Sequence, residues 1–346
     1  MSLNKASWIT EAKAKPLKVD EAEMWKPGPG EIVIKNAAIA INPVDWKIQD
    51  SGLLPVSYPN ILGEDIAGTV AAVGPGVTRF RPGQRAMAYT HGIATKRPAN
   101  GGFQLYSVVP DALAAPIPDS LSFAHASVLP LALSTAAAGL FEASNLGLPL
   151  PPADGSVAAE KRGTLLVWGA ASAVGMAAVQ LARAAGCRVV ATASERNHAV
   201  VRSLGADAVL DYRAASVVRD VVDAVKGGDG EFVGVFDAIS SAASIELLGE
   251  VLEAFGETKV VMVLFPPESL PRCYKAVHAF SFSIVSPPNE HVADGIWRKW
   301  VPEALAKGTL QAKPDPLVVG SGLESVQGAM ERQKAGVSAQ KIVVTL

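Results

Sequence analysis

The stretch "TLLVWGAASAVGMAAVQLARAAG", residues 164–186, constrains the fold more than any other part of this sequence. It reads as an unbroken apolar strand, a turn of small residues, and a helix that ends at Gly186. The same alternation continues with further strands predicted at "CRVVATA", "AVLDYR", "FVGVFDAIS", "KVVMVL" and "FSFSIVS". Unbroken apolar strands that alternate with helices indicate a parallel sheet covered on both faces. The sequence therefore predicts a doubly wound α/β domain with a six-stranded parallel sheet.

The first part of the chain, to about residue 125, has a different pattern. Short β-branched runs such as "EIVIKNAAIAI" and "IAGTVAAVG" are separated by "KPGPG" and "RPGQ", which is typical of a partly open β barrel. A helix is predicted over 125–143, and another helix with a closing strand follows residue 289. We therefore expect two domains, one made of residues 1–125 and 289–346 and the other of residues 126–288.

The turn after the first α/β strand is a candidate phosphate site. Free backbone N–H groups at the positive end of a helix dipole bind pyrophosphate when no bulky side chain intervenes. The pattern is not a clean G-x-G-x-x-G, because Ala171 replaces the middle glycine, but the strand before it and the helix after it favour dinucleotide binding. The candidate residues are Gly169, Ala171, Ser172, Ala173, Val174 and Gly175, with Ser172 as a possible hydroxyl donor.

The end of the second α/β strand bears on which dinucleotide is bound. NAD sites place Asp or Glu there for the ribose 2′-hydroxyl, whereas NADP sites replace the acid and add cations. Here the strand runs into "ATASERNH", so the candidates for a 2′-phosphate are Ser194, Arg196 and Asn197, with Tyr212 from the next strand. Glu195 would favour NADH if it pointed inward, and Ser194 could simply cap a helix. The sequence favours NADPH.

Composition excludes several classes of protein. Hydrophobic residues make up 49% and charged residues 18% of the 346 residues, so extensive disorder is not expected. The net charge of −2 gives no electrostatic case for binding nucleic acid or an anionic membrane. Two separated cysteines, Cys187 and Cys273, exclude a disulfide framework and a four-cysteine zinc lobe. Without a signal-peptide pattern or a long apolar run, we expect a cytoplasmic protein.

The segment "ILGEDIAG", residues 61–68, raises the question of a metal. Zinc binding needs Cys, His or carboxylate side chains that converge on one point. None of the five histidines has a partner at ligand spacing. For Glu64 and Asp65 we expect a structural role, capping a turn and pairing with a nearby Arg or Lys. No metal is predicted.

Several motifs together resemble the medium-chain dehydrogenase/reductase superfamily in its zinc-independent quinone and enoyl reductase branch. They are "PGPGEIVIKNAAIAINPVDWK", "LGEDIAGTVAAVGPGVTRFRPGQRAMAY", "GGFQLYSVV" and "VWGAASAVGMAAVQLARAAG". The segments "INPVDWK", "LGLPLPP" and "SLGADAVLDYR" resemble the fungal ToxD-like proteins and trans-acting polyketide enoyl reductases most closely. The resemblance implies a GroES-like β-rich barrel and a Rossmann domain. It also implies that Glu64 stands where zinc-dependent members carry a ligand.

The resemblance further implies NADPH-dependent reduction of an activated C=C bond, in an α,β-unsaturated carbonyl or thioester. Lys47 is then the candidate cation or proton donor, although a plain surface lysine is an equal alternative. Related mitochondrial-type reductases carry a tyrosine slightly further on, where this chain reads "DSGLL". Thr135 matches a threonine near the cofactor, and the backbone at Leu264 and Phe265 is expected to approach the carboxamide.

Two other functions stay open at this stage: a quinone or small-enone reductase, and a catalytically idle NADPH-binding protein. The expected partners are a small-molecule or carrier-tethered enoyl substrate and a possible polyketide synthase, with no nucleic acid and no membrane. The chain could be a monomer or a homodimer. In the latter case the predicted sixth strand within 279–286, "AFSFSIVS", is an apolar edge candidate for pairing.

Overall fold

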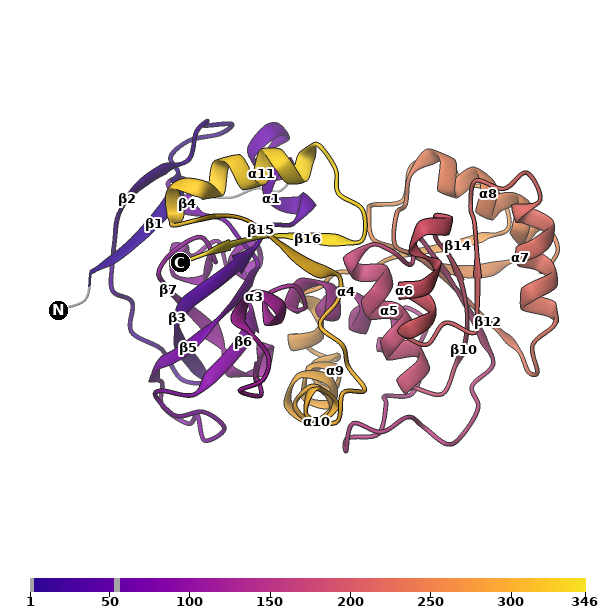
Figure 1. The fold of residues 1–346 in the computed structure, drawn as a ribbon, viewed down its shortest axis with the longest axis horizontal. Helices are drawn as coiled ribbons and strands as arrows, with labels where there is room; N and C mark the ends of the chain where they lie inside the picture. The colour runs from indigo at the N-terminus through magenta and orange to yellow at the C-terminus, as the bar shows by residue number, and fades with distance from the viewer. Residues whose placement is uncertain (1–2, 53–56) are drawn as a thin grey trace. The chain divides into compact units, whose positions relative to one another are not determined.

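The structure, a computed structural model, describes residues 3–52 and 57–346. The chain divides into two compact units, drawn from indigo to yellow along the chain in Figure 1. The first unit comprises residues 1–131 and 312–346, and the second comprises residues 132–311. The second unit thus continues to residue 311, whereas the sequence pattern had suggested a boundary at residue 288.

A six-stranded sheet forms the centre of the second unit. Its order is β11-β10-β9-β12-β13-β14, and every neighbouring pair is parallel. The predicted six-stranded parallel sheet is therefore confirmed. The strands are β9 (Thr164–Trp168), β10 (Arg188–Thr192), β11 (Ala208–Leu210), β12 (Phe232–Asp237), β13 (Thr258–Met262) and β14 (Tyr274–His278).

Helices cover both faces of this sheet. α7 (Val217–Lys226) and α8 (Ala242–Leu252) pack side by side and bury Val221 and Leu248 against Leu166 and Trp168. Side chains alternate along a strand, so the intervening residues of β9 face the opposite way. There α5 (Ala173–Ala184) contacts β9, β10 and β12, and α6 (His198–Ser203) follows β10. This is the doubly wound arrangement expected from the sequence.

The sixth strand lies earlier in the chain than predicted. β14 is the sequence "YKAVH", whereas "FSFSIVS" contains bends, turns and the 3₁₀ helix η4 (Ser283–Val285). The reason is that β14 occupies the edge of the sheet, where its side chains are half-buried or exposed and need not be apolar. The segment 279–286, suggested as a possible pairing edge, is therefore not a strand in this structure.

The helix predicted over 125–143 is two helices. α3 (Phe123–Ala126) ends before Pro130, which begins α4 (Pro130–Phe141), a position where a missing N–H group costs little. The span Phe123–Phe141 is long and apolar enough to cross a membrane by composition, but 78% of its most apolar window is buried inside the structure. It therefore has the properties of a core segment.

Residues 289–311 belong to the second unit because their aromatic side chains are buried in it. They form α9 (Glu290–Ala293), the π-helix η5 (Asp294–Trp300) and α10 (Val301–Lys307). Trp297 and Trp300 are fully buried, and the Trp297 indole donates a hydrogen bond of 3.1 Å to Ser134 Oγ. At the end of the segment, the Gln311 N–H donates to Gln180 Oε1 at 2.8 Å.

The first unit contains a seven-stranded and a three-stranded sheet, in agreement with the expected GroES-like barrel. The seven-stranded sheet has the order β15-β16-β3-β5-β6-β8, with β7 also paired to β3, and the three-stranded sheet has the order β2-β1-β4. The strands are β1 (Asn4–Ile9), β2 (Lys18–Ala22), β3 (Glu31–Ala40), β4 (Asn60–Ile61), β5 (Asp65–Val73), β6 (Arg85–Tyr89), β7 (Tyr106–Pro110), β8 (Ala114–Pro116), β15 (Asp315–Ser321) and β16 (Gln340–Thr345).

Two helices of the first unit, far apart in sequence, lie side by side. They are α1 (Pro43–Ser51) and α11 (Val326–Lys334) (Figure 1). The remaining short helices are α2 (Gly92–Thr95), η1 (Pro98–Asn100), η2 (Asp111–Leu113) and η6 (Leu323–Ser325) in the first unit, and η3 (Glu195–Asn197) in the second. Pairing with α11 fixes α1 on the sheet, and α1 carries Lys47, the candidate proton donor.

Candidate functional site

The turn between β9 and α5 is tightly built and needs its two glycines. Gly169 has φ +75°, and its N–H donates to Thr192 Oγ1 at 3.0 Å. A Cβ on Gly175 would lie 2.4 Å from the Gly169 carbonyl oxygen, a distance that no real side chain tolerates. Both positions therefore exclude larger residues, and the backbone of the turn stays close to any ligand above it.

The same turn has the chemistry of an anion cradle. Ala171, Ala173 and Val174 are half-buried with short side chains, and the first N–H groups of α5 have no acceptor within the helix. Together with the helix dipole, these groups fit a pyrophosphate. The Ser172 hydroxyl caps the helix: it accepts from Gly175 N–H at 3.0 Å and donates to Gly169 O at 2.9 Å. Its proton is thus used inside the protein in this structure.

The residues expected to recognise a 2′-phosphate lie at the carboxyl ends of β10 and β11. The buried Ser194 hydroxyl accepts from Asn197 Nδ2 at 3.1 Å, which leaves the hydroxyl proton to be donated elsewhere. Arg196 and Glu195 are both exposed in η3, so the geometry does not choose between them. Tyr212 is half-buried, and the Arg213 guanidinium lies 5.2 Å from its ring centre.

The turn after β12 contacts both the phosphate turn, through Ile239, and the end of β13, through Ser240. Asp237 accepts from the Ile239 and Ser240 N–H groups at 3.0 and 2.9 Å, and burial raises the pKa of its carboxyl against those hydrogen bonds. Ser240 Oγ accepts from Val263 N–H at 3.0 Å. The chain then emerges at Leu264 and Phe265, which are partly exposed at the carboxyl end of the sheet, where ligands of such folds bind.

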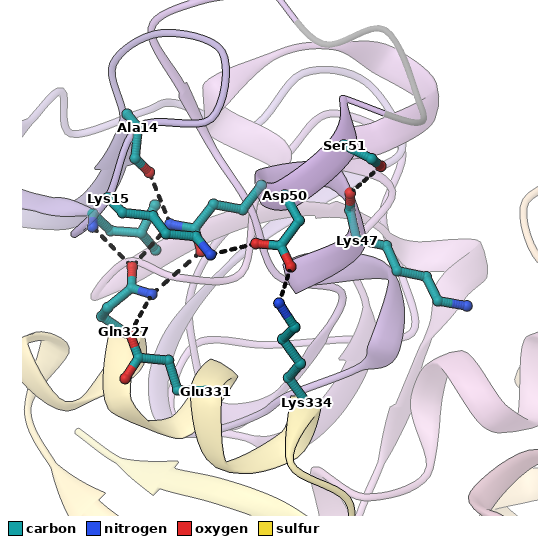
Figure 2. A network of polar contacts seen from close by, with 10 residues as sticks. Ala14, Lys15, Lys47, Asp50, Ser51, Gln327, Glu331 and Lys334 are labelled. Carbon is teal, nitrogen blue, oxygen red and sulfur yellow. Dashed lines mark hydrogen bonds and ion pairs between the residues drawn. The ribbon is translucent and has the colours of Figure 1, made fainter.

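Thr135 and Lys47 are the two remaining candidates. Thr135 is buried within α4 of the second unit. Lys47 is half-buried in α1 of the first unit, and burial lowers the pKa of its ammonium. Figure 2 shows its side chain pointing away from the network in which Asp50 accepts from Lys15 and Lys334. Within the described residues its nearest specific contact is the Trp46 ring, 5.7 Å from Nζ, so the ammonium has no carboxylate partner there.

The segment that carries Glu64 contributes to a buried polar cluster in the first unit. Asp65 pairs with Lys341 of β16 at 2.8 Å, and both side chains are almost fully buried. Asn42, the residue before α1, donates to Asp65 at 2.8 Å and accepts from Lys341. The Asn42 backbone N–H donates to Asp45 at 2.7 Å. The expected pairing with a basic residue is thus present for Asp65, whose partner is 276 positions away.

Glu64 differs from Asp65 because it is buried without a cation. Neither of its carboxylate oxygens has a hydrogen-bond partner of ordinary geometry among the residues described. Burial, followed by the nearby charges of Asp45 and Asp65, raises the pKa of Glu64 well above its usual value, against the lowering effects of Tyr89 and the Ile93 backbone. Burial likewise raises the pKa of Asp45, to about 7. The folded protein therefore favours the protonated form of Glu64 over the ionised form.

This donor set does not fit a zinc ion. Within residues 3–52 and 57–346 no group of three or more His, Cys, Asp or Glu side chains is arranged to hold a metal. The positive charge beside these carboxylates is the ammonium of Lys341, which pairs with Asp65 and lowers the pKa of Asp45 against the larger effect of burial. No metal-dependent step is derived from these residues.

Sequence reasoning missed the parts of these sites that come from distant segments. Asn42, Asp45 and Lys341 build the polar cluster, and Ile239 lies directly over Gly169. A local signal existed for Asp45, since an Asn followed directly by a Pro, with an Asp three positions after the Asn, is typical of a helix start. Leu53 and Leu54, in the stretch "DSGLL" where related reductases carry a tyrosine, lie outside the described residues.

Comparison with known proteins agrees with this architecture. Residues 28–119 match the alcohol dehydrogenase GroES-like domain, and residues 173–282 match the zinc-binding dehydrogenase family. The chain is 42% identical to the trans-enoyl reductase himH of Aspergillus japonicus, over 99% of this chain and 98% of that protein. It is 38% identical to the dehydrogenase orsE of Emericella nidulans, over the full length of both.

Solved structures show the same fold along the whole chain. An alcohol dehydrogenase superfamily protein from Novosphingobium aromaticivorans superimposes with a TM-score of 0.78 at 26% identity, covering 100% of both chains. The protein therefore belongs to the medium-chain dehydrogenase/reductase superfamily, in the branch of the quinone and enoyl reductases.

Proposed function

We propose that this protein is an NADPH-dependent enoyl reductase of secondary metabolism, which reduces an activated C=C bond next to a carbonyl or thioester. The observation that carries the proposal is the combination of the anion cradle at Gly169–Gly175 with full-length similarity to a protein named as a trans-enoyl reductase. The residues around Glu64 support it, because their donor set does not fit the zinc ion that zinc-assisted alcohol oxidation would need.

The residues of the second unit would hold the cofactor from one end to the other. The turn Gly169–Gly175 would bind the pyrophosphate, Ser194 and Arg196 the 2′-phosphate, and the backbone after β13 the carboxamide. The free hydroxyl proton of Ser194 favours NADPH, because a phosphate accepts a hydrogen bond that this group can donate. Reduced nicotinamide supplies a hydride when it is bound.

The chain itself has to steady the negative charge on the substrate carbonyl and to deliver a proton to the α-carbon. Lys47 is proposed for one or both tasks. Its partial burial makes the ammonium a stronger acid than an exposed lysine, which suits proton donation near neutral pH. Its lack of a carboxylate partner among the described residues leaves the charge available to an oxyanion.

The partner and location follow from the same proposal. A trans-acting reductase would receive its substrate from a polyketide synthase, tethered to a carrier, in the cytoplasm. Two other functions would replace the enoyl reductase proposal if it failed. One is reduction of a small quinone or enone, and the other is binding of the cofactor without catalysis. The titration below, combined with turnover of simple enones and acyl thioesters, distinguishes these functions.

The first experiment is a fluorescence titration of the EDTA-treated protein with NADPH and, separately, with NADH. We expect tight NADPH binding and much weaker NADH binding. Arg196→Gln should weaken NADPH binding by about tenfold, the effect of losing one charge-assisted contact. The matched control is Arg202→Gln, an exposed arginine of α6, which should change neither affinity.

Each result of this titration has a distinct meaning. Equal affinities for the two nucleotides would indicate that Glu195 holds the ribose and that the NADPH proposal is wrong. Binding of neither nucleotide would contradict the reductase proposal as a whole. Binding of NADPH without oxidation by any enone or enoyl thioester would favour the idle cofactor-binding role.

A further inference from the structure

Exposed apolar side chains gather at the carboxyl ends of three neighbouring strands of the second unit. Ile239 follows β12, Leu264 and Phe265 follow β13, and Phe280 follows β14, with exposed fractions of 41%, 37%, 54% and 37%. Scattered apolar residues on a surface are normal, but a contiguous group at a ligand-binding edge indicates a site. The group begins at the phosphate turn, because a Cβ on Gly169 would lie 2.3 Å from the Ile239 side chain.

Three rings at the far end of this group pack against one another. Phe265 stacks on His278 with ring centres 4.4 Å apart and planes 8° from parallel. Phe280 meets His278 edge-on at 4.2 Å and Phe265 at 5.7 Å. We call Phe265, His278 and Phe280 the aromatic trio. Such mutual packing holds the rings in place, so the trio is a preformed wall and not three independent side chains.

The trio is also free of charge. Residues 260–267 and 276–288 contain no Asp, Glu, Lys or Arg. Burial lowers the pKa of His278, although the Val263 backbone acts in the opposite direction, so the imidazole is neutral at physiological pH. An uncharged aromatic wall suits an apolar chain and gives nothing to a charged carrier-protein surface.

The strand order puts His278 and Phe280, at the end of β14, one strand past the proposed carboxamide site at the end of β13. The sheet runs β10-β9-β12-β13-β14, with the 2′-phosphate candidates at β10 and the phosphate turn at β9. A dinucleotide held by the residues proposed above would have its nicotinamide half near the ends of β12 and β13. β14 is three strand spacings from β9, about 14 Å away. His278 and Phe280 would therefore lie on the far side of the proposed carboxamide site from the phosphate turn, where a substrate chain could extend.

We propose that the aromatic trio is the binding wall for the acyl chain of the substrate, and that it makes the enzyme select long apolar enoyl thioesters over short ones. This inference rests on the proposed enoyl reductase function. It assigns a specificity role to Phe280 and His278, which form part of the wall without belonging to the cofactor cradle.

The dimensions of the group favour an acyl chain over a second copy of the protein. A stable protein interface buries roughly 800 Å² and about 20–30 residues on each side. Here the exposed group consists of four side chains that continue directly from the cofactor turn. A flexible hydrocarbon chain of a few methylene units matches a surface of this size, whereas a dimer contact would need much more.

The test uses Phe280→Ala in the full-length protein with crotonyl- and dodecenoyl-N-acetylcysteamine and NADPH. We expect kcat/KM for the dodecenoyl substrate to fall about tenfold, while kcat/KM for the crotonyl substrate and the NADPH Kd stay within about twofold. Phe280→Leu should recover part of the loss. The control is Val157→Ala, an exposed apolar residue elsewhere in the second unit, which should leave both substrates unchanged.

A binding measurement separates this inference from the proposed function. Calorimetry with dodecanoyl-N-acetylcysteamine and the NADP⁺-loaded protein should show weaker binding to Phe280→Ala than to the wild type. If that difference appears while neither protein turns over any enone, the acyl wall stands and the reductase function does not. Three results for Phe280→Ala would overturn the acyl wall. They are an equal fall in kcat/KM for the crotonyl and dodecenoyl substrates, an equal loss of NADPH affinity, and a change in the molecular mass of the protein in solution.

Discussion

Replacing Glu64 by Gln should make the protein more stable at alkaline pH. The Glu64 side chain is buried, its oxygens have no ordinary hydrogen-bond partner among the described residues, and its pKa is raised well above 4.5. Glutamine has nearly the same shape as a neutral glutamic acid but never ionises. The substitution therefore keeps the packing and removes only the proton that the folded state has to retain.

The magnitude follows from proton linkage. Above about pH 4.5 the unfolded chain loses the Glu64 proton while the folded chain keeps it, so the free energy of unfolding falls as the pH rises. One such proton gives a slope of about 1.4 kcal/mol per pH unit up to the folded pKa. Glu64→Gln should thus gain up to about 1.4 kcal/mol relative to the wild type for each pH unit between about pH 4.5 and the raised pKa of folded Glu64. Asp45 contributes to both proteins in the same direction until its own pKa of about 7.

Urea unfolding followed by circular dichroism at several pH values measures this gain. The control is Glu11→Gln, whose side chain is exposed in the first unit, and it should leave the difference from wild type independent of pH. Parallel pH profiles for Glu64→Gln and wild type would refute the reasoning, because they would mean that Glu64 is ionised in the folded protein.

Three further substitutions test other parts of the structure. Lys47→Ala should lower enone turnover by about 100-fold with an unchanged NADPH Kd, and Lys47→Arg should keep part of the activity if the positive charge is what matters. Unchanged turnover of Lys47→Ala in steady-state kinetics would exclude Lys47 as proton donor or oxyanion contact. Lys341→Met should destabilise the first unit by about 3–5 kcal/mol because Asp65 loses its buried partner, and adding Asp65→Asn should recover much of this in urea unfolding. Gly169→Ala should weaken NADPH binding by about tenfold or more because of its φ of +75° and the contact with Ile239, and a double variant with Ile239→Ala that binds no better than the single one would assign the effect to the backbone alone.

The α/β half of the fold could be predicted because its signals are local. Five of the six strands in the second unit are apolar runs in the expected places. Gly169 and Gly175 mark the turn from β9 into α5. β14 was misplaced because an edge strand such as "YKAVH" is allowed to carry a lysine and a histidine, while the more apolar "FSFSIVS" packs as turns. Local hydrophobicity cannot separate these two cases.

The sites were predictable only where one short segment builds them. The phosphate turn is continuous in sequence, and its residues lie together as expected. The raised pKa of Glu64 depends instead on burial, followed by the nearby charges of Asp45 and Asp65. Asp65 in turn meets Lys341 through strand pairing between β3, β5 and β16. No spacing rule connects residues 65 and 341, so this buried cluster could not have been foreseen.

The first unit is interrupted in sequence by the second, and this fixes an order of assembly during synthesis. All six strands of the inserted sheet have left the ribosome by residue 278, while the seven-stranded sheet still lacks β15 and β16. Until the end of the chain emerges, part of β3 remains an open edge and Asp65 has no ammonium beside it. The first unit, whose first residues are synthesised before the second unit, is thus completed after it. Its seven-stranded sheet stays incomplete until β16 is available to pair with β3.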